Sequence, residues 1–194
     1  MGLEVAPQKF EALFLYRGEH GAPPKTTHVV VDGTSVRVGT QLKYLGLYLD
    51  DTWSFDGRFA RLAPRAKAMA HALSRLLPSL GGPDGRVRRL YATTVRAVAL
   101  YGSPIWADAL MASRRGKMML RRIFRRIAIR VIRGYRTVSH AAASVLAGLP
   151  PIELYAQMYA EVYGRTKELG GLGVVLIPRV RAAVRLQAWR RMLE

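Results

Sequence analysis

The hydrophobic spacing of the chain changes near Asp56, and this change limits the folds open to it more than any other feature. Before Asp56, short apolar runs alternate with turn residues. After it, apolar residues recur every three or four positions, beginning with Phe59 and continuing to Leu77. The first pattern is typical of strands and the second of amphipathic helices. The sequence therefore predicts an α+β fold that is mainly α, with a short β region followed by a multi-helix region.

Turn residues divide the first 50 positions into short strands. Asp32 and Gly33 form the pair that a two-residue hairpin turn favours, because both positions need a positive φ. The stretch Gly18–Lys25, with two prolines and two glycines, is expected to be a loop. The strand candidates are Ala12–Tyr16 (a buried strand), Thr27–Val31, Thr34–Val38 and Leu42–Leu49.

Capping residues set the expected bounds of the helices. In the first helix, Pro64 must either kink the helix or begin its main part. Another apolar series from Val87 to Leu100 predicts a second helix, which is interrupted near Gly102-Ser103-Pro104. The later helices are expected from the cap Ser113 to a left-handed stop at Gly134, from Ser139 to Gly148, from Pro151 to about Leu169, and over Arg179–Leu193.

The segment between Asp108 and Glu153 contains no acidic residue, in a chain of net charge +18 in which 25 of the 31 basic residues are arginine. At 100° per residue, its apolar side chains share one arc of the helix: Leu120, Ile123, Phe124, Ile127 and Val131. A basic face that is merely solvated normally includes glutamates that pair with the arginines. We therefore favour a bound polyanion over a solvated face. Nucleic acid is the first candidate and an anionic membrane surface the second. The candidate nucleic-acid-binding residues are Arg114, Arg115, Arg121, Arg122, Arg125, Arg126, Arg130, Arg133 and Arg136.

Residue types that the chain lacks exclude several other functions. It has no cysteine, so disulfides, zinc knuckles and thiol nucleophiles are ruled out. The histidines are dispersed without metal-ligand spacing, and we expect no metal site. We also expect no membrane span, because no apolar run approaches the required ~18 residues. The tryptophans are expected to be packing anchors rather than base-stacking platforms. The histidines are His20, His28, His71 and His140, and the tryptophans Trp53, Trp106 and Trp189.

Several strings occur in a fixed order along nearly the whole chain: Gly2–Lys9, Leu42–Leu47, Leu100–Trp106, Tyr135–Ala142 and Ala147–Pro151. Together they resemble successive signatures of the non-LTR (LINE-like) retrotransposon reverse transcriptases. The resemblance is greatest to the arthropod type-1 elements that insert into ribosomal RNA genes. It implies three regions: an end-of-palm and primer-grip-like β region over 1–54, thumb-like helices over 55–112, and a basic helical linker over 113–194.

The resemblance also implies roles for residues in the β region. Lys9 would lie near the phosphates of the incoming nucleotide, although Phe10 stands where the family usually has threonine. Tyr44-Leu45-Gly46 would match the primer-grip hairpin, which makes Lys43 and Tyr44 candidates for nucleic-acid binding.

Reverse transcriptases use palm carboxylates to hold two Mg²⁺ ions. The resemblance implies that these carboxylates, with the rest of the palm and the fingers, lie upstream of Met1. We therefore expect no cofactor in this chain and Mg²⁺ only in the complete polymerase. The string Tyr48-Leu49-Asp50-Asp51 fits the catalytic Tyr-x-Asp-Asp pattern. It follows Lys9 and Tyr44, however, whereas the catalytic turn should precede both, so we favour a strand end over a metal site.

These observations predict a fragment of an RNA-directed DNA polymerase, inactive alone, that binds RNA and RNA–DNA duplex through arginine–phosphate contacts. Its expected location is intracellular, in the nucleus. The alternatives are a non-catalytic basic helical protein that binds nucleic acid, or one that docks on membranes or acidic partners.

Overall fold

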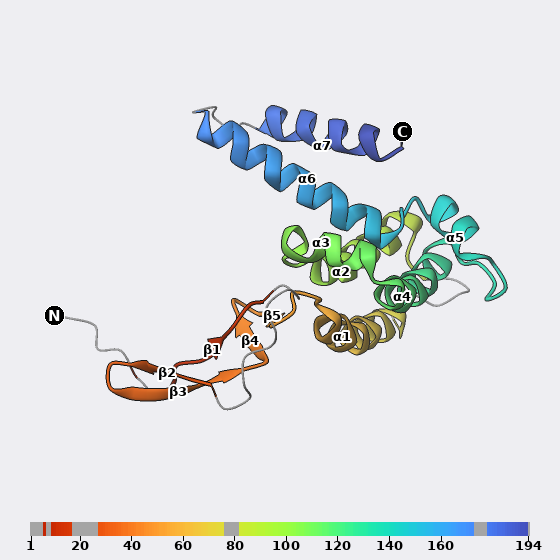
Figure 1. Ribbon diagram of the computed structural model, residues 1–194. Coiled ribbons are helices and arrows are strands. Elements are labelled where there is room, and N and C mark those ends of the chain that lie inside the picture. The colour runs from red at the N-terminus through yellow and green to blue at the C-terminus, as the bar shows by residue number, and fades with distance from the viewer. Residues whose placement is uncertain (1–5, 7–8, 17–26, 76–81, 173–177, 194) are drawn as a thin grey trace. The chain divides into compact units, whose positions relative to one another are not determined.

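A computed structural model describes residues 6, 9–16, 27–75, 82–172 and 178–193. Most of Gly2–Lys9 and the whole of the expected loop Gly18–Lys25 lie outside the described residues. The described part is mainly helical with short strands near its start (Figure 1), which confirms the α+β, mainly α fold. The chain divides into two compact units, Met1–Arg58 and Phe59–Glu194.

The first unit contains the strands. They are β1 (Ala12–Leu13), β2 (His28–Val31), β3 (Thr34–Gly39), β4 (Gln41–Tyr44) and β5 (Leu47–Asp50). Strands β2 and β3 pair antiparallel with Val31 opposite Thr34, so only Asp32 and Gly33 lie in the turn. Their φ angles of 49° and 73° are those of the expected two-residue turn, and the predicted hairpin is confirmed.

Two strand predictions were wrong. Leu42–Leu49 is a second hairpin rather than one strand, because Leu45 and Gly46 both take positive φ (46° and 81°) and reverse the chain between Tyr44 and Leu47. A hairpin at this place is what the resemblance implies. Ala12–Tyr16 was expected to be a buried strand, but β1 pairs with β3 over only two residues and is half buried. The side chains of Phe14 and Leu15 that follow it are exposed.

The helices begin with α1, which starts within the first unit. They are α1 (Asp56–Arg75), α2 (Gly85–Ala99), α3 (Ser103–Ala112), α4 (Arg114–Ile132), α5 (His140–Ala147), α6 (Ile152–Gly171) and α7 (Pro178–Leu193). Ser113 and Ser139 cap α4 and α5 as predicted, since each hydroxyl oxygen accepts a hydrogen bond from a first-turn N–H. Gly148 has a φ of 64° and ends α5 as expected.

Helix α1 decides between the two alternatives for Pro64, and the end of α4 differs from the sequence prediction. Helix α1 continues through Pro64, so the proline does not begin its main part. At the end of α4, the left-handed residue is Arg133 (φ 56°) rather than Gly134. The backbone N–H of Gly134 donates to the carbonyl of Ile129 at 3.0 Å, which is the longer bond of a Schellman motif. Gly134 therefore takes the position after the left-handed residue.

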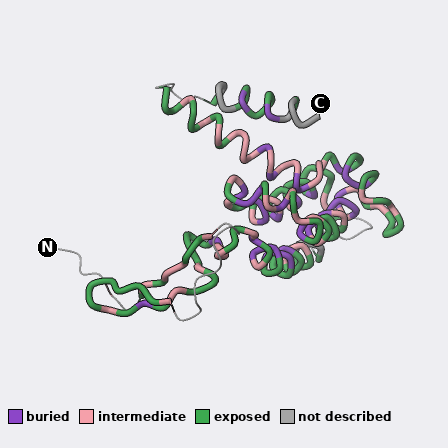
Figure 2. Tube along the Cα trace, viewed as in Figure 1, coloured by how far each residue is buried: buried purple, intermediate pink, exposed green. Residues whose placement is uncertain are grey.

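The core of the second unit forms where α3, α4 and α1 meet, as the purple segments of Figure 2 indicate. Trp106 is fully buried, and its ring makes an edge contact with Phe59 at 5.7 Å between centroids. Its indole N–H donates to the carbonyl of Tyr101. Gly116 permits this packing, because a Cβ there would lie 3.0 Å from the Phe59 ring. Trp106 is thus a packing anchor as expected, whereas Trp53 is partly exposed and the side chain of Trp189 lies outside the described residues.

None of the helices in the described part of the chain is long and apolar enough to cross a membrane.

Candidate nucleic-acid interface

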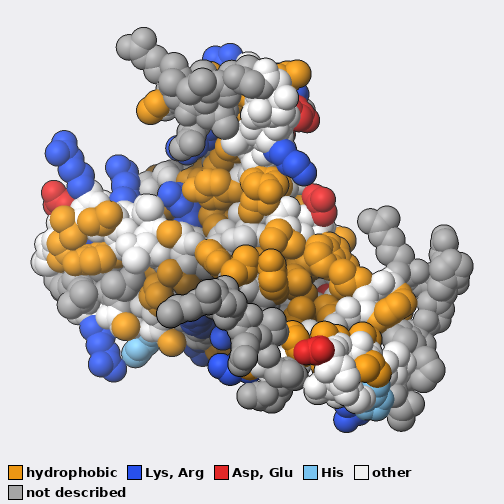
Figure 3. Space-filling view, turned by 90° about the vertical axis from the view of Figure 1, so that its left-hand side faces the viewer, with side chains coloured by type: hydrophobic (Ala, Val, Ile, Leu, Met, Phe, Trp, Pro, Cys, Tyr) orange, Lys and Arg blue, Asp and Glu red, His pale blue; other side chains and the backbone are white. Residues whose placement is uncertain are grey.

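Helix α4 has one apolar face and one basic face, as its sequence predicted. All five residues of the predicted apolar arc are buried. The basic residues do not share one environment, because some are exposed and Arg125 and Arg130 are half buried. On the face drawn in Figure 3, basic side chains are scattered among hydrophobic ones. The exposed members of the predicted set are Arg114, Arg115, Arg121, Arg122, Arg126, Arg133 and Arg136.

Arg121 forms an ion pair that joins α4 to α6. Its guanidinium contacts the carboxylate of Glu153, which lies in the first turn of α6 and is only 3% exposed. The other carboxylate oxygen, Oε2, is buried without a hydrogen-bond partner. Burial lowers the pKa of nearby His140, the charge of Glu153 opposes this shift, and Arg121 and Arg125 add to it. The half-exposed Arg121 therefore has a structural role besides any contact with a ligand.

Arg125 holds the loop that follows α4. Its Nε donates to the carbonyl oxygen of Val138 at 3.0 Å, and its Nη2 donates to the same oxygen and to the carbonyl of Arg136. The backbone N–H of Val138 also donates to the carbonyl of Tyr135 at 3.2 Å, which closes a turn over residues 135–138. One guanidinium thus fixes the backbone of this turn, and most of its donors face protein rather than solvent.

Arg88 is a buried arginine that the sequence analysis did not single out. Its Nε donates to the carbonyl of Pro83 and its Nη1 to the carbonyl of Arg130, both at 2.9 Å, so it joins the start of α2 to the end of α4. Arg133 donates to the same Pro83 carbonyl at 3.1 Å. Burial lowers the pKa of Arg88, and the positive charges of Arg133 and Arg130 lower it further. In the sequence, Arg88 is one of three arginines in four positions, and no local pattern distinguishes it from exposed Arg86 and Arg89.

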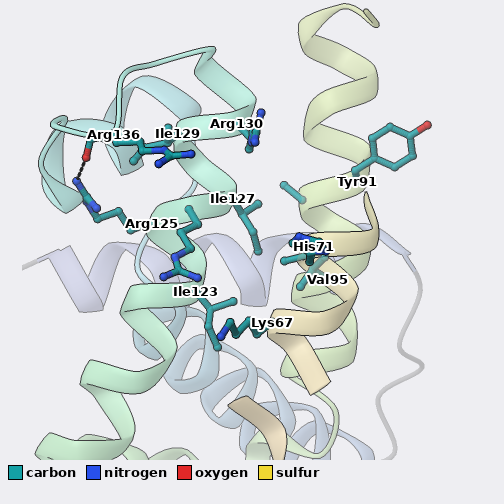
Figure 4. Close-up of a pocket in the computed structure, with 13 residues that line it drawn as sticks. Lys67, His71, Tyr91, Val95, Ile123, Arg125, Ile127, Ile129, Arg130 and Arg136 are labelled. Atoms are coloured by element: carbon teal, nitrogen blue, oxygen red, sulfur yellow. Dashed lines mark hydrogen bonds between the residues drawn. The ribbon is translucent and has the colours of Figure 1, made fainter. Parts of the chain in front are cut away.

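A groove of about 560 Å³ lies between α1, α2 and α4. Its floor is apolar, and Figure 4 shows Ile127 of α4 pointing toward Val95 of α2 and His71 of α1, with Lys67 next to Ile123. Four arginines of the predicted set line it: Arg125, Arg126, Arg130 and Arg136. The structure therefore brings part of the predicted set together around one opening, which we call the basic groove.

Helix α1 adds Lys67 and His71 to the basic groove, and the sequence analysis missed both. They are separated by four positions and so share one face of α1. That spacing was visible in the sequence, but nothing there placed this face opposite α4. The remaining predicted arginines, Arg114, Arg115, Arg121, Arg122 and Arg133, do not line the groove.

The candidates in the first unit lie on its surface. Lys9 is exposed, and so are Lys43 and Tyr44 at the end of β4. Lys43 lies opposite Tyr48 in the β4–β5 hairpin.

Asp50 ends β5 and accepts two hydrogen bonds on its Oδ2, from the Ser54 hydroxyl and from the backbone N–H of Phe55 at 2.9 Å. This carboxylate caps the loop that leads to α1. Its Oδ1 is buried without a hydrogen-bond partner, and the neighbouring Asp51 is half buried. Two adjacent carboxylates without a third ligand do not make a two-metal site. Among the described residues, no three acidic or histidine side chains are grouped so that they could hold a metal ion. The described part of the chain therefore does not fit the Mg²⁺ pair of a polymerase.

The chain is similar to a 115 kDa protein in the type-1 retrotransposable element R1DM of Drosophila melanogaster, with 31% identity over 146 residues. The match covers 74% of this chain and 14% of that protein, so the chain spans a small part of its relative. No protein-family model matches the chain, and no solved structure matches it. The predicted relation to type-1 retrotransposable elements is thereby confirmed.

Proposed function

Starting from this relation to a type-1 retrotransposable element, we propose that the chain is the template–primer-binding part of a reverse transcriptase. In this proposal, residues 55–112 act as the thumb and 113–194 as a basic linker. The chain binds RNA and RNA–DNA duplex through phosphate contacts and supplies none of the polymerase's metal-binding carboxylates.

The observation that carries the proposal is the basic groove. Six of its lining residues are lysine, arginine or histidine, and none of the described residues that line it is acidic. Its apolar floor lowers the local dielectric, which strengthens the attraction of the rim for an anion. Arginine is also the side chain best matched to phosphate, because its planar fork can donate two parallel hydrogen bonds.

Contacts of this kind read the phosphate backbone rather than the bases, so we expect little sequence preference. Each phosphate contact releases counterions, and affinity should therefore fall steeply as salt is added. The ligand is expected to be a polyanion with regularly spaced phosphates.

Lys67 and Arg126 provide the sharpest test, because they lie on different helices of the groove and both side chains are exposed. We expect the double change Lys67→Gln and Arg126→Gln to weaken binding of an RNA–DNA duplex by tenfold or more, at roughly 1 kcal/mol for each lost phosphate contact. The measurement is fluorescence anisotropy at several salt concentrations, and the slope of log K against log salt should become shallower by about 2.

The matched control is Arg185→Gln with Arg190→Gln. Replacing these two exposed arginines of α7 removes the same amount of positive charge at a place outside the groove. If both double variants lose affinity equally, binding depends on net charge and the groove has no special role. If vesicles of anionic lipid or polyglutamate bind the chain as tightly as the duplex does at equal salt, the proposal is wrong and a membrane or an acidic partner replaces it.

Within a longer protein that contains the palm, the same groove variant should shorten primer-extension products more than it slows addition of the first nucleotide. Unchanged product lengths would contradict the thumb assignment while leaving nucleic-acid binding in place.

A further inference from the structure

The turn over residues 135–138 presents an aromatic ring to solvent. Tyr135 is 84% exposed, the highest value among the exposed large hydrophobic side chains of the described residues. Burial of the apolar surface of such a ring normally stabilises a fold. The fold gains almost none of this from Tyr135.

The backbone that holds Tyr135 is nevertheless well fixed. The Schellman bond from Gly134 to Ile129 precedes it, and the bond from Val138 back to Tyr135 closes the turn. Arg125 holds the carbonyls of Arg136 and Val138 from the side. An exposed ring on a backbone fixed from three directions loses little conformational freedom on binding, which favours recognition.

Positive charge flanks the ring. Arg133 and Arg136 are both exposed and lie within two positions of Tyr135 in the chain. Arg136 also lines the basic groove. The loop therefore combines an exposed aromatic ring with arginines on either side of it in the sequence, and Arg136 connects it to the groove where we propose that a phosphate backbone binds.

We propose that Tyr135 is a stacking platform for an unpaired base of an RNA or DNA strand that leaves the basic groove, with Arg133 and Arg136 contacting the flanking phosphates. Aromatic stacking with basic neighbours is a general means of holding single strands. Paired bases are stacked on each other and offer no free face to a lone ring. The inference rests on the proposed function and adds the substrate class, a single strand beside the duplex.

The test compares two probes on the full chain: an oligouridylate of about ten nucleotides, and a blunt RNA–DNA duplex that has no unpaired base. Tyr135→Leu removes the aromatic face while keeping an apolar side chain. We expect it to weaken oligouridylate binding by about tenfold to a hundredfold and to change duplex binding less than twofold. Tyr135→Phe should retain single-strand affinity, because the ring rather than the hydroxyl makes the contact.

Tyr101→Leu is the matched control, since Tyr101 is also exposed in a turn but its neighbours Leu100 and Gly102 are uncharged. A second measurement is photocrosslinking with 5-iodouracil in the probe. If the base stacks on Tyr135, the crosslink should form on the peptide that contains Tyr135, whereas a purely structural role of Tyr135 would not produce it.

The outcomes separate this inference from the function on which it rests. If the wild-type chain binds neither probe, both fail. If duplex binding depends on Lys67 and Arg126 but Tyr135→Leu affects oligouridylate no more than Tyr101→Leu does, only the stacking role is wrong. Crosslinks that map elsewhere on the chain would also overturn it.

Discussion

Arg121 and Arg122 are neighbours in the sequence with different surroundings in the structure. Arg121 contacts the buried carboxylate of Glu153, whereas the exposed side chain of Arg122 lies outside the basic groove. Neutralising Arg121, Arg122, Arg125 and Arg126 together would therefore combine a loss of ligand contacts with damage to the fold. Substitutions on this helix have to be chosen by environment.

We expect Arg121→Gln to lower the free energy of unfolding by roughly 1 to 2 kcal/mol, because it leaves the Glu153 carboxylate buried beside an uncharged partner. The half-exposed position of Arg121 keeps this below the cost of breaking a fully buried pair. Arg122→Gln, which removes the same charge, should change stability by no more than about 0.5 kcal/mol. Urea denaturation of the two variants makes the comparison. Equal stabilities would mean that the ion pair contributes nothing to the fold.

The elements that the sequence predicted best are those marked by local chemistry. Helices begin at the capping hydroxyls of Ser113 and Ser139, and α5 ends at the left-handed Gly148. The first hairpin turns at Asp32-Gly33. The second hairpin was not predicted from the spacing because apolar residues continue on both sides of Gly46, and only the positive φ of Leu45 and Gly46 shows the reversal.

The basic groove and the Arg88 contacts could not be predicted in the same way, because both depend on how helices pack. The residues of α4 that would face outward were predictable from helical spacing. Which of them face α2 or α6 depends on contacts between residues far apart in the sequence, such as the 42 positions that separate Arg88 from Arg130 and the 32 that separate Arg121 from Glu153. The sequence carries no periodic signal for such contacts.

At the scale of elements, Arg88 is expected to hold α2 against α4. Replacement by leucine would leave the carbonyls of Pro83 and Arg130 without these donors, so we expect a loss of about 2 to 4 kcal/mol in the free energy of unfolding. Arg88→Lys should lose nearly as much, because one ammonium group cannot replace a planar fork directed at two carbonyls. The control is Arg89→Leu at the exposed neighbouring position, and thermal denaturation is the measurement. Full stability in Arg88→Lys would show that charge alone suffices.

The whole molecule combines a high net charge with an uneven core. Among the described residues, Val36, Leu47 and Phe55 are the buried hydrophobic side chains of the first unit, and all the others belong to the second. The charge of +18 opposes compaction, since like charges repel within the folded chain. A bound polyanion removes this repulsion, so binding and stability are linked.

This linkage predicts opposite effects of salt on the free and the bound protein. For the free chain, raising NaCl from about 0.05 to 0.5 M shortens the Debye length several-fold, screens the repulsion and should raise Tm. For the chain saturated with RNA–DNA duplex at low salt, the same addition dissociates the complex and should lower Tm toward the free value. The two melting curves should therefore converge at high salt.

The control is the variant with Arg185→Gln and Arg190→Gln. Its Tm should rise less with salt in the free state, because the charges that it lacks contribute to the repulsion. Its Tm should fall as before in the bound state, because these charges lie outside the groove. A free chain whose Tm does not rise with salt would mean that its basic side chains are already compensated within the fold, and the argument from net charge to a polyanionic ligand would then be wrong.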